Sequence, residues 1–237
     1  MWSELMGCLG NSSITRPGSD DCGIWITDWK FEKVVGGMRI ARSFFQEDPV
    51  TCARALVGCR LNWGPCAGMV VETEAYEAEG DAACHTAFRP GARAFGQDHP
   101  AGTAYVYLNY GIHWMLNVLL KGERDGFVLI RALEPLTGSA VMRAARGVEN
   151  ERQLCSGPGK LAQALGVIGA HHGFDLCADP EFGFALAAAP GPVVATPRIG
   201  IVRAVERPWR FHLAGNPHVS GSRIQNQTGT KKKTGRE

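Results

Sequence analysis

The sequence lacks any apolar run long enough to span a bilayer, and its start lacks the charged and then apolar order of a secretion signal. We therefore expect a soluble, cytoplasmic protein without a membrane partner. Internal repeats are also missing. With 237 residues, of which 45% are hydrophobic and 20% charged, the chain can bury one substantial core. These features predict one globular domain with irregular ends.

Paired cysteines and a strong charge imbalance are absent as well. The eight cysteines occur singly, with Cys52, Cys59 and Cys66 seven residues apart and no CxxC pair. This spacing favours reduced thiols and argues against a zinc site. The net charge of +2 permits nucleic-acid binding but does not by itself indicate it.

The two ends of the chain show no regular pattern. Residues 1–37 mix Gly, Ser, Asp and aromatic residues, so we expect a poorly ordered extension there and a domain over residues 38–220, with regular structure starting at Arg42. Residues 221–237 have the polarity of a disordered tail, made basic by Lys231–Lys233. Solvation is the simpler interpretation of these lysines, and a weak contact with phosphate is the alternative.

The stretch Val70–His85 combines carboxylates, an aromatic ring and a histidine, and it begins with the alternation typical of a strand. At a period of two, Glu74 and Tyr76 project from the same face and share one wall of a pocket. His85 follows eleven residues after Glu74, behind a Glu-, Gly- and Asp-rich loop that can fold back opposite Tyr76. An acid beside two rings suits chemistry on a flat ligand.

Simpler interpretations of these residues stay open. The glutamates can be the solvated side of the strand, and we keep that role for Glu72. His85 can be a surface or core histidine with no part in a reaction.

Around this stretch, the pattern predicts a helix packed on a sheet. Asp48 supplies an N-cap and Pro49 a first helical position, and an apolar face runs to Val57 before Gly58 ends the helix. Two further helices are predicted from residue 137 or 138 to 146 and from about 157 to 165. Strands are predicted over residues 59–63, 127–133, 197–202 and 208–213.

The segment Gly102–Leu120 predicts a β-hairpin with Tyr110 at its tip, because Asn109 to Gly111 is turn-like between two strand patterns. An exposed aromatic tip can act as a wedge that unstacks a base step in the minor groove of a duplex. Alternatively, Tyr110 only caps the hairpin. Asn117 is an amide in an otherwise apolar strand and therefore needs specific hydrogen-bond partners.

Two cationic side chains need an anionic partner. Arg131 lies in the middle of a strand, where it requires a carboxylate or a phosphate. Lys160 follows a Ser-Gly-Pro-Gly segment that lacks the Gly–x4–Gly–Lys spacing of a P-loop. Together with the first amides of its helix, Lys160 can still hold one phosphate of a nucleic-acid backbone.

Six segments, in order, resemble the alkyladenine (3-methyladenine) DNA glycosylase family. They are VETEAY with His85 beyond it, YVYLNYG with Asn117 beyond it, LIRALEPL, LCSGPGKL, PRIGI, and PWRF followed by GNPHVS. The match runs from about Arg42 to Ser220 and departs from the family at Cys84, Asn109, residues 112–114 and the longer KGERDGF turn. The resemblance implies an α+β fold, a single mixed domain with a curved antiparallel sheet, flanking helices and a protruding β-hairpin. It implies no metal and no other cofactor.

The resemblance also implies which residues carry the reaction. Glu74 would be the general base that polarises a water for attack on C1′ of the sugar. Arg131 and the backbone carbonyl of Ile199 would help to hold that water.

Further residues would bind the DNA. Tyr76, His85 and Tyr107 would enclose the flipped purine, and the backbone amide of His85 would read its edge. Asn117 would obstruct the exocyclic amine of a normal guanine, and Tyr110 would fill the gap left in the duplex.

These roles predict a monofunctional DNA glycosylase that acts as a monomer on double-stranded DNA containing alkylated purines such as 3-methyladenine. No lysine in the pocket motifs can form a Schiff base, so attack by water would leave an abasic site for base excision repair. Two alternatives stay open, a non-catalytic nucleic-acid-binding module and a hydrolase of free nucleosides. Glu74 argues against the first, since a carboxylate weakens binding to phosphates. Tyr110 and the loop arginines argue against the second, since a small substrate has no use for them.

Overall fold

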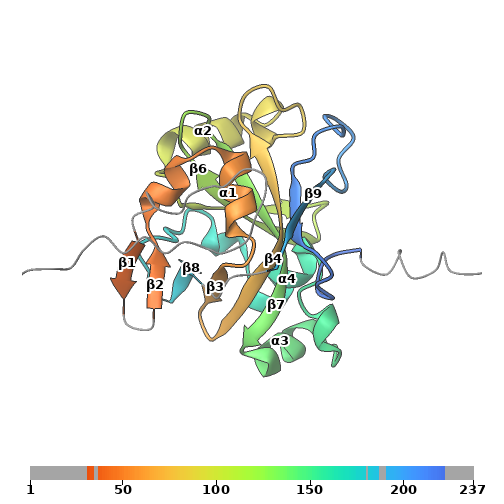
Figure 1. Cartoon of the computed structure of the whole chain (residues 1–237). Helices are drawn as coiled ribbons and strands as arrows, with labels where there is room; N and C mark the ends of the chain where they lie inside the picture. Colours follow the sequence, from red (N-terminus) through yellow and green to blue (C-terminus); the bar gives the residue numbers. More distant parts are fainter. Residues whose placement is uncertain (1–30, 35–36, 180, 187–190, 222–237) are drawn as a thin grey trace, which may run out of the picture.

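The computed structural model describes residues 31–34, 37–179, 181–186 and 191–221 (Figure 1). Most of the expected N-terminal extension, the basic tail and Lys231–Lys233 lie outside the described residues. Strands β1 (Phe31–Val34) and β2 (Gly37–Ile40) pair antiparallel, so regular structure begins before Arg42, where we expected it to start. The guanidinium of Arg39 donates to the carbonyls of Leu176 and Phe182, so β2 is positioned by residues far along the chain.

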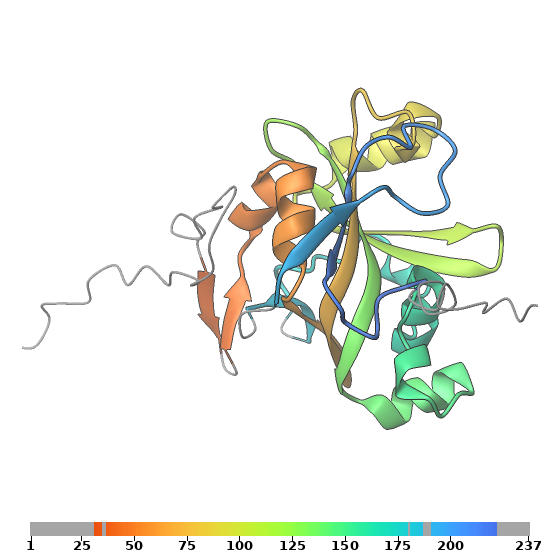
Figure 2. The same ribbon diagram turned by 45° about the vertical axis from the view of Figure 1, so that its right-hand side comes forward.

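A curved antiparallel sheet forms the centre of the molecule (Figure 2). Its other strands are β3 (Arg60–Trp63), β4 (Cys66–Glu77), β5 (Ala104–Asn109), β6 (His113–Leu120), β7 (Gly126–Thr137), β8 (Phe182–Ala185), β9 (Val193–Thr196) and β10 (Arg210–Leu213). The strand order is β1-β2-β8-β3-β4-β7-β6-β5, while β10 pairs with β4 and β9 pairs with β10. The predicted α+β class with a curved antiparallel sheet is confirmed.

Among the described residues, four α-helices flank this sheet: α1 (Pro49–Leu56), α2 (Pro90–Asp98), α3 (Ser139–Arg146) and α4 (Pro158–Leu165). The N-cap predicted for α1 is confirmed, because the Asp48 carboxylate accepts hydrogen bonds from the amides of Val50 and Thr51. The hydroxyl of Thr73 on β4 donates to the carbonyl of Ala53 over 2.7 Å, which joins α1 to the sheet. No helix in the described ranges is long and apolar enough to cross a membrane.

Strand β4 carries the Glu74 stretch and is paired on both sides. Along β7 the register is Tyr76 with Phe127 and Glu74 with Leu129, and it shifts on both sides of Glu72. These shifts leave Arg131 on β7 without a register partner, and such irregularities redirect side chains. Gly126 allows β7 to approach β4 closely where their pairing begins, because a Cβ there would lie 2.1 Å from the carbonyl oxygen of Tyr76.

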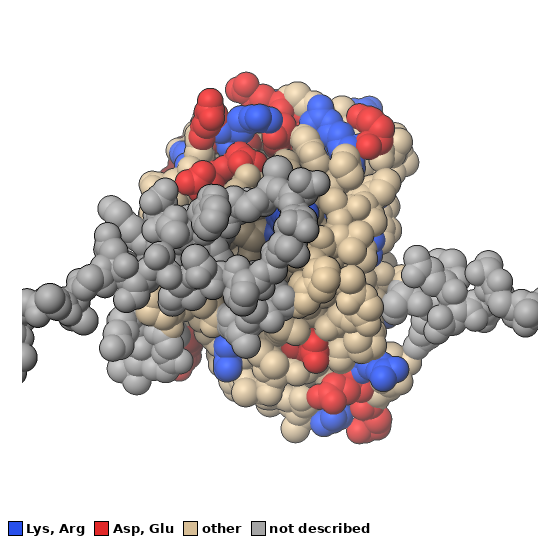
Figure 3. Space-filling model, in the orientation of Figure 1, with Lys and Arg blue, Asp and Glu red and all other residues tan. Residues whose placement is uncertain are grey.

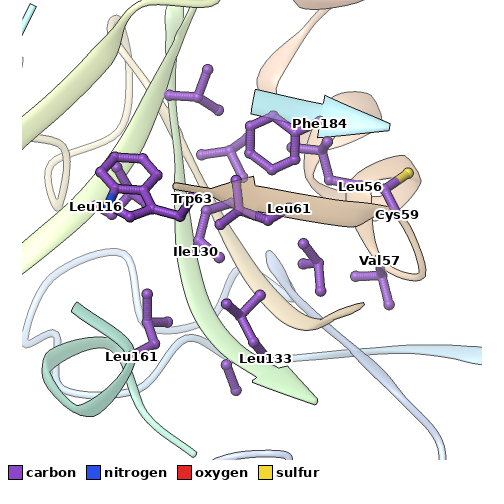
Figure 4. Packing of buried hydrophobic residues seen from close by; sticks show 14 of the residues in the cluster. Leu56, Val57, Cys59, Leu61, Trp63, Leu116, Ile130, Leu133, Leu161 and Phe184 are labelled. Carbon is purple, nitrogen blue, oxygen red and sulfur yellow. The ribbon is translucent and has the colours of Figure 1, made fainter. Parts of the chain in front are cut away.

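Two apolar clusters stabilise the fold. The larger one joins the sheet to α1 and α4, and Figure 4 shows Leu61, Ile130 and Leu161 packed within it. The smaller one consists of Cys84, Ala92, Phe95, Tyr105, Leu119 and Phe127, and Tyr76 and Tyr107 pack against it. Burying each large apolar side chain contributes about 1.5–3 kcal/mol. The smaller cluster therefore gives these two tyrosine rings a firm support.

The predicted hairpin is confirmed as β5 and β6, which project from the sheet between α2 and α4 in Figure 2. The strand predicted over residues 197–202 is wrong, because β9 ends at Thr196 and the chain continues as a loop. Pro197 has no N–H for a ladder, Gly200 has a φ of +78°, and the Ile199 amide donates to the Glu74 carboxylate. The loop therefore folds over β4 and does not extend the sheet.

Charge does not single out one surface in the face that Figure 3 shows. Blue and red side chains are interspersed there at the upper and lower ends of the molecule, and the visible part between them is mostly tan. A binding site therefore has to be found from local geometry.

Candidate active site

A cavity of about 660 Å³ opens between the C-terminal half of β4, the β5–β6 hairpin and the loop after β9. Seven of the nine predicted site residues line it: Tyr76, His85, Tyr107, Tyr110, Asn117, Arg131 and Ile199. An eighth, Glu74, lies directly beneath and bonds to three of them. The tertiary structure therefore brings together residues that are spread over more than half of the sequence.

Glu74 is fully buried and held by two hydrogen bonds and one ion pair. Its Oε1 accepts from the amide of Ile199 over 2.7 Å. Its Oε2 accepts from the hydroxyl of Tyr76 over 2.8 Å and lies 3.1 Å from Nη1 of Arg131. The alternation that placed Glu74 and Tyr76 on one face is confirmed. Ile199 meets Glu74 through its amide, and the role predicted for its carbonyl stays a prediction.

Arg131 lies between two carboxylates on β4. Its Nε donates to Oε1 of Glu72 over 2.9 Å, and its Nη1 faces Glu74. Burial alone would lower the pKa of Arg131, but Glu74 and Glu72 raise it above its usual value. The expected anionic partner of Arg131 is therefore a pair of carboxylates, and its charge is permanent.

Glu72 is not a solvated glutamate, and that prediction is wrong. Its side chain is 0% exposed, and it accepts hydrogen bonds from Arg131, from Nε of Arg210 over 2.5 Å, and from the amide and hydroxyl of Ser220 over 2.7 and 2.8 Å. Burial would raise the pKa of Glu72, but the guanidiniums of Arg131 and Arg210 lower it below its usual value. The face shared with Glu74 is covered by β10 and Ser220, which lie far along the chain.

His85 and Tyr107 form the opposite wall of the cavity. Their ring centroids lie 4.3 Å apart at an angle of 60°, and Nδ1 of His85 is 3.1 Å from the hydroxyl of Tyr105. Burial, followed by the nearby guanidinium of Arg89, lowers the pKa of His85 to about 4. His85 is therefore a neutral ring at pH 7.

Burial also keeps two tyrosines of the cavity, Tyr76 and Tyr107, protonated. Burial raises the pKa of Tyr107 to about 12. Burial and then the Glu74 carboxylate raise the pKa of Tyr76 far above its usual value. Both phenols are neutral at pH 7, so the Tyr76 hydroxyl is a donor to Glu74.

Asn117 both supports the hairpin and reaches the cavity. Its Nδ2 donates to the carbonyl of Tyr105 on the neighbouring strand over 3.1 Å, and the side chain lines the cavity. The buried amide thus has the specific partner that its position in an apolar strand requires. The hydrogen bond to Tyr105 does not test the role predicted for Asn117 in rejecting guanine, which stays a prediction.

Tyr110 stands at the mouth of the cavity and is 86% exposed. Its φ of 50° and the φ of 71° at Gly111 turn the chain at the hairpin tip. The ring does not fold back into a covered position, so the interpretation of Tyr110 as a mere cap is weakened.

Lys160 is the one predicted site residue that the fold leaves apart from the cavity. It lies on the exposed side of α4 with its Nζ 3.5 Å from the hydroxyl of Ser156, whereas Pro158 of the same helix reaches the cavity wall. Its contact with a backbone phosphate stays a prediction.

Four residues around the site were missed from the sequence: Arg210, Ser220, and the buried pair of Arg198 with Asp81. The available signal was the arginine in each of the segments PRIGI and PWRF, since an arginine flanked by apolar residues requires an anion. Within the described part of the chain, no cluster of three His, Cys, Asp or Glu side chains could hold a metal ion.

The chain is similar to known proteins over most of its length. A family model described as methylpurine-DNA glycosylase matches residues 43–217. A protein from Rhodopseudomonas palustris (strain BisB18) is 48% identical over 185 residues, which cover 78% of this chain and 92% of its own length. A protein from Rhizobium meliloti (strain 1021) is 46% identical over 178 residues, covering 75% and 94%. Both carry the name "Putative 3-methyladenine DNA glycosylase".

Replacing Glu72 by Gln should strongly destabilise the protein. The amide leaves Arg210 without a neutralising partner and Arg131 with Glu74 alone, and breaking a buried ion pair typically costs about 3–5 kcal/mol. Urea denaturation at pH 7 measures the change in the free energy of unfolding. The exposed Glu79→Gln is the matched control and should leave it unchanged. Glu72→Gln is therefore unsuitable as a neutral control for Glu74.

The same variant should change the response to acid. Because the folded-state pKa of Glu72 is lowered, its stabilisation is present above the unfolded pKa of about 4.3 and is lost as the pH falls through the folded value. The free energy of unfolding of the wild type should fall more steeply below about pH 4.5 than that of Glu72→Gln. If the free energy of unfolding falls equally with pH in the wild type and in Glu72→Gln, the lowered pKa of Glu72 is refuted.

Proposed function

This chain belongs to the methylpurine-DNA glycosylase family, and we propose that it is a 3-methyladenine DNA glycosylase acting on alkylated purines in duplex DNA. The observation that carries the proposal is the buried Glu74 carboxylate, held by two hydrogen bonds and the ion pair with Arg131 beneath a cavity lined with aromatic rings. Action as a monomer stays a prediction.

The cavity suits a positively charged purine. Alkylation at N3 or N7 places positive charge on the base and weakens its bond to the sugar, which makes the base a better leaving group. Aromatic rings attract such a cation by about 0.5–2 kcal/mol. The neutral His85 adds no repulsion, and the charge of Arg131 is balanced by Glu72 and Glu74.

Glu74 is placed to activate a water molecule. An ionised carboxylate offers about four lone-pair positions. The hydrogen bonds from Ile199 and Tyr76 occupy two of them, and Nη1 of Arg131 forms an ion pair at Oε2. A remaining position can accept a hydrogen bond from a water. As the water oxygen bonds to C1′, Glu74 accepts its proton and the purine leaves with the electrons of the glycosidic bond. The product is an abasic site, since no lysine lines the cavity among the described residues.

The mouth of the cavity supports a duplex as the substrate. Tyr110 projects on one side, and Val202, which is 92% exposed, projects on the other. Arg203 also lines the cavity and makes no ion pair with any described residue, so it is available to a phosphate. A hydrolase of free nucleosides would not need the projecting side chains at the mouth of the cavity. A module that only binds nucleic acid would not need the Glu74 carboxylate.

Replacing Glu74 by Gln should abolish excision and preserve binding. The amide keeps the shape of the side chain but cannot accept the proton of the water, a loss of about 10²–10⁴-fold in rate. Single-turnover release from a duplex with one alkylated purine, followed by alkaline cleavage, measures excision. The exposed Glu79→Gln is the matched control. Release within a few-fold of the wild type would rule out this role for Glu74.

Replacing Tyr110 by Ala should weaken binding to a lesion-bearing duplex on the order of tenfold, because the wedge that replaces the extruded base is lost. Binding to a single strand with the same lesion should change little, since there is no base stack to open. Ile112→Ala, at the same tip but away from the cavity, is the control variant. Equal losses on both substrates would mean that Tyr110 only supports the hairpin.

Replacing Asn117 by Ser should raise the release of undamaged guanine relative to alkylated adenine. A pocket rejects a base with one extra group by steric clash and by leaving polar atoms unpaired, effects of about 1–3 kcal/mol. Total activity should fall as well, because the bond to the Tyr105 carbonyl is lost. The measurement compares the release rates of undamaged guanine and of alkylated adenine by the same variant. An unchanged ratio assigns Asn117 to the hairpin alone.

A further inference from the structure

A second buried ion pair lies behind the cavity wall. The side chains of Arg198 and Asp81 are both 0% exposed. Two parallel bonds join them, Nη1 to Oδ2 over 2.5 Å and Nη2 to Oδ1 over 2.9 Å. Neither is among the described residues that line the cavity. This bidentate geometry is the strongest that an arginine and a carboxylate form.

Arg198 connects the elements that build this wall. Its guanidinium donates to the carbonyl of Ala75 on β4 over 2.9 Å and to the carbonyl of Ala204 on the loop after β9 over 3.3 Å. It also lies 4.6 Å from the centroid of the Tyr76 ring. Because Ile199 follows it directly, Arg198 helps to place the amide that holds Glu74.

This contact poses an electrostatic problem for a cavity that binds cations. The π-system of Tyr76 attracts positive charge. The guanidinium of Arg198, which lies outside the cavity, already makes a cation–π contact with this ring. An unbalanced guanidinium there would repel a cationic purine across the ring, because charges in a protein interior are poorly screened. The carboxylate of Asp81, bonded to both terminal nitrogens of Arg198, balances it.

A buried ion pair is not in itself a good means of stabilisation, since apolar replacements are often equally stable. We propose that Arg198 and Asp81 act as a positioning and selectivity pair for the cavity. Arg198 holds Tyr76 and the Ile199 amide in place, and Asp81 cancels the charge of Arg198 so that the wall accepts a cationic purine. This inference rests on the proposed function and adds the origin of the preference for charged over neutral purines.

The test measures how well the protein distinguishes a cationic purine from its neutral counterpart. Two otherwise identical duplexes carry 7-methylguanine or guanine on a 2′-fluoro sugar, which resists hydrolysis, and the ratio of their dissociation constants is the selectivity. Asp81→Asn leaves Arg198 unbalanced and should lower the selectivity on the order of tenfold. Asp81→Ser removes the same charge and serves as a second variant. Thermal melting verifies that each variant is folded.

The double variant Asp81→Asn with Arg198→Gln removes both charges and should return the selectivity to near the wild-type value, although both affinities fall. Asp175→Asn changes the net charge equally at the Arg42 ion pair, away from the cavity, and should leave the selectivity unchanged. The proposal is overturned if the double variant is no more selective than Asp81→Asn, or if both Asp81 variants fail to fold. A wild type that does not distinguish the two duplexes also overturns it. Excision of alkylated purines with an unchanged selectivity in Asp81→Asn would refute this inference and leave the proposed function standing.

Discussion

The position of Arg131 between two buried carboxylates is the constraint on which the site depends. Buried charges are unfavourable unless they are paired and fully hydrogen-bonded, so this cluster must be closed on every side. Glu72 and Glu74 supply the negative charge from β4, and Arg210 and Ser220 complete the shell around Glu72. The curved sheet is what allows β7 and β10 to flank β4 at this point.

This cluster gives the cavity a floor of fixed charge and geometry. Above it, the tyrosine rings rest on the smaller apolar cluster, and burial keeps His85 neutral. The result is a buried carboxylate beneath an aromatic cavity in which the charge of Arg131 is balanced by Glu72 and Glu74. The same principle recurs behind the wall, where Asp81 accompanies Arg198. A site that extracts a cationic base from DNA needs this balance, because DNA binding itself requires positive charge near the mouth.

Local features were predicted well because local rules determine them. The cap at Asp48, the helix that ends at Gly147 and the hairpin tip at Tyr110 all follow from residue types a few positions apart. The shared face of Glu74 and Tyr76 follows from the period of a strand. Six ordered segments, read as a family resemblance, added the prediction of which residues would surround the base.

By itself, then, the sequence determined the type of most elements, the face of β4 that carries the acid, and the family. Only the tertiary structure decided which polar groups are buried. Glu72 changes from an expected solvent contact to the centre of an ion cluster because Ser220, 148 residues away, covers it. Residues 197–202 leave the sheet because their polar groups find partners on β4 and in the loop that carries Asp81. Burial and pairing depend on contacts between distant segments, and the periodicity of a single segment carries no information about them.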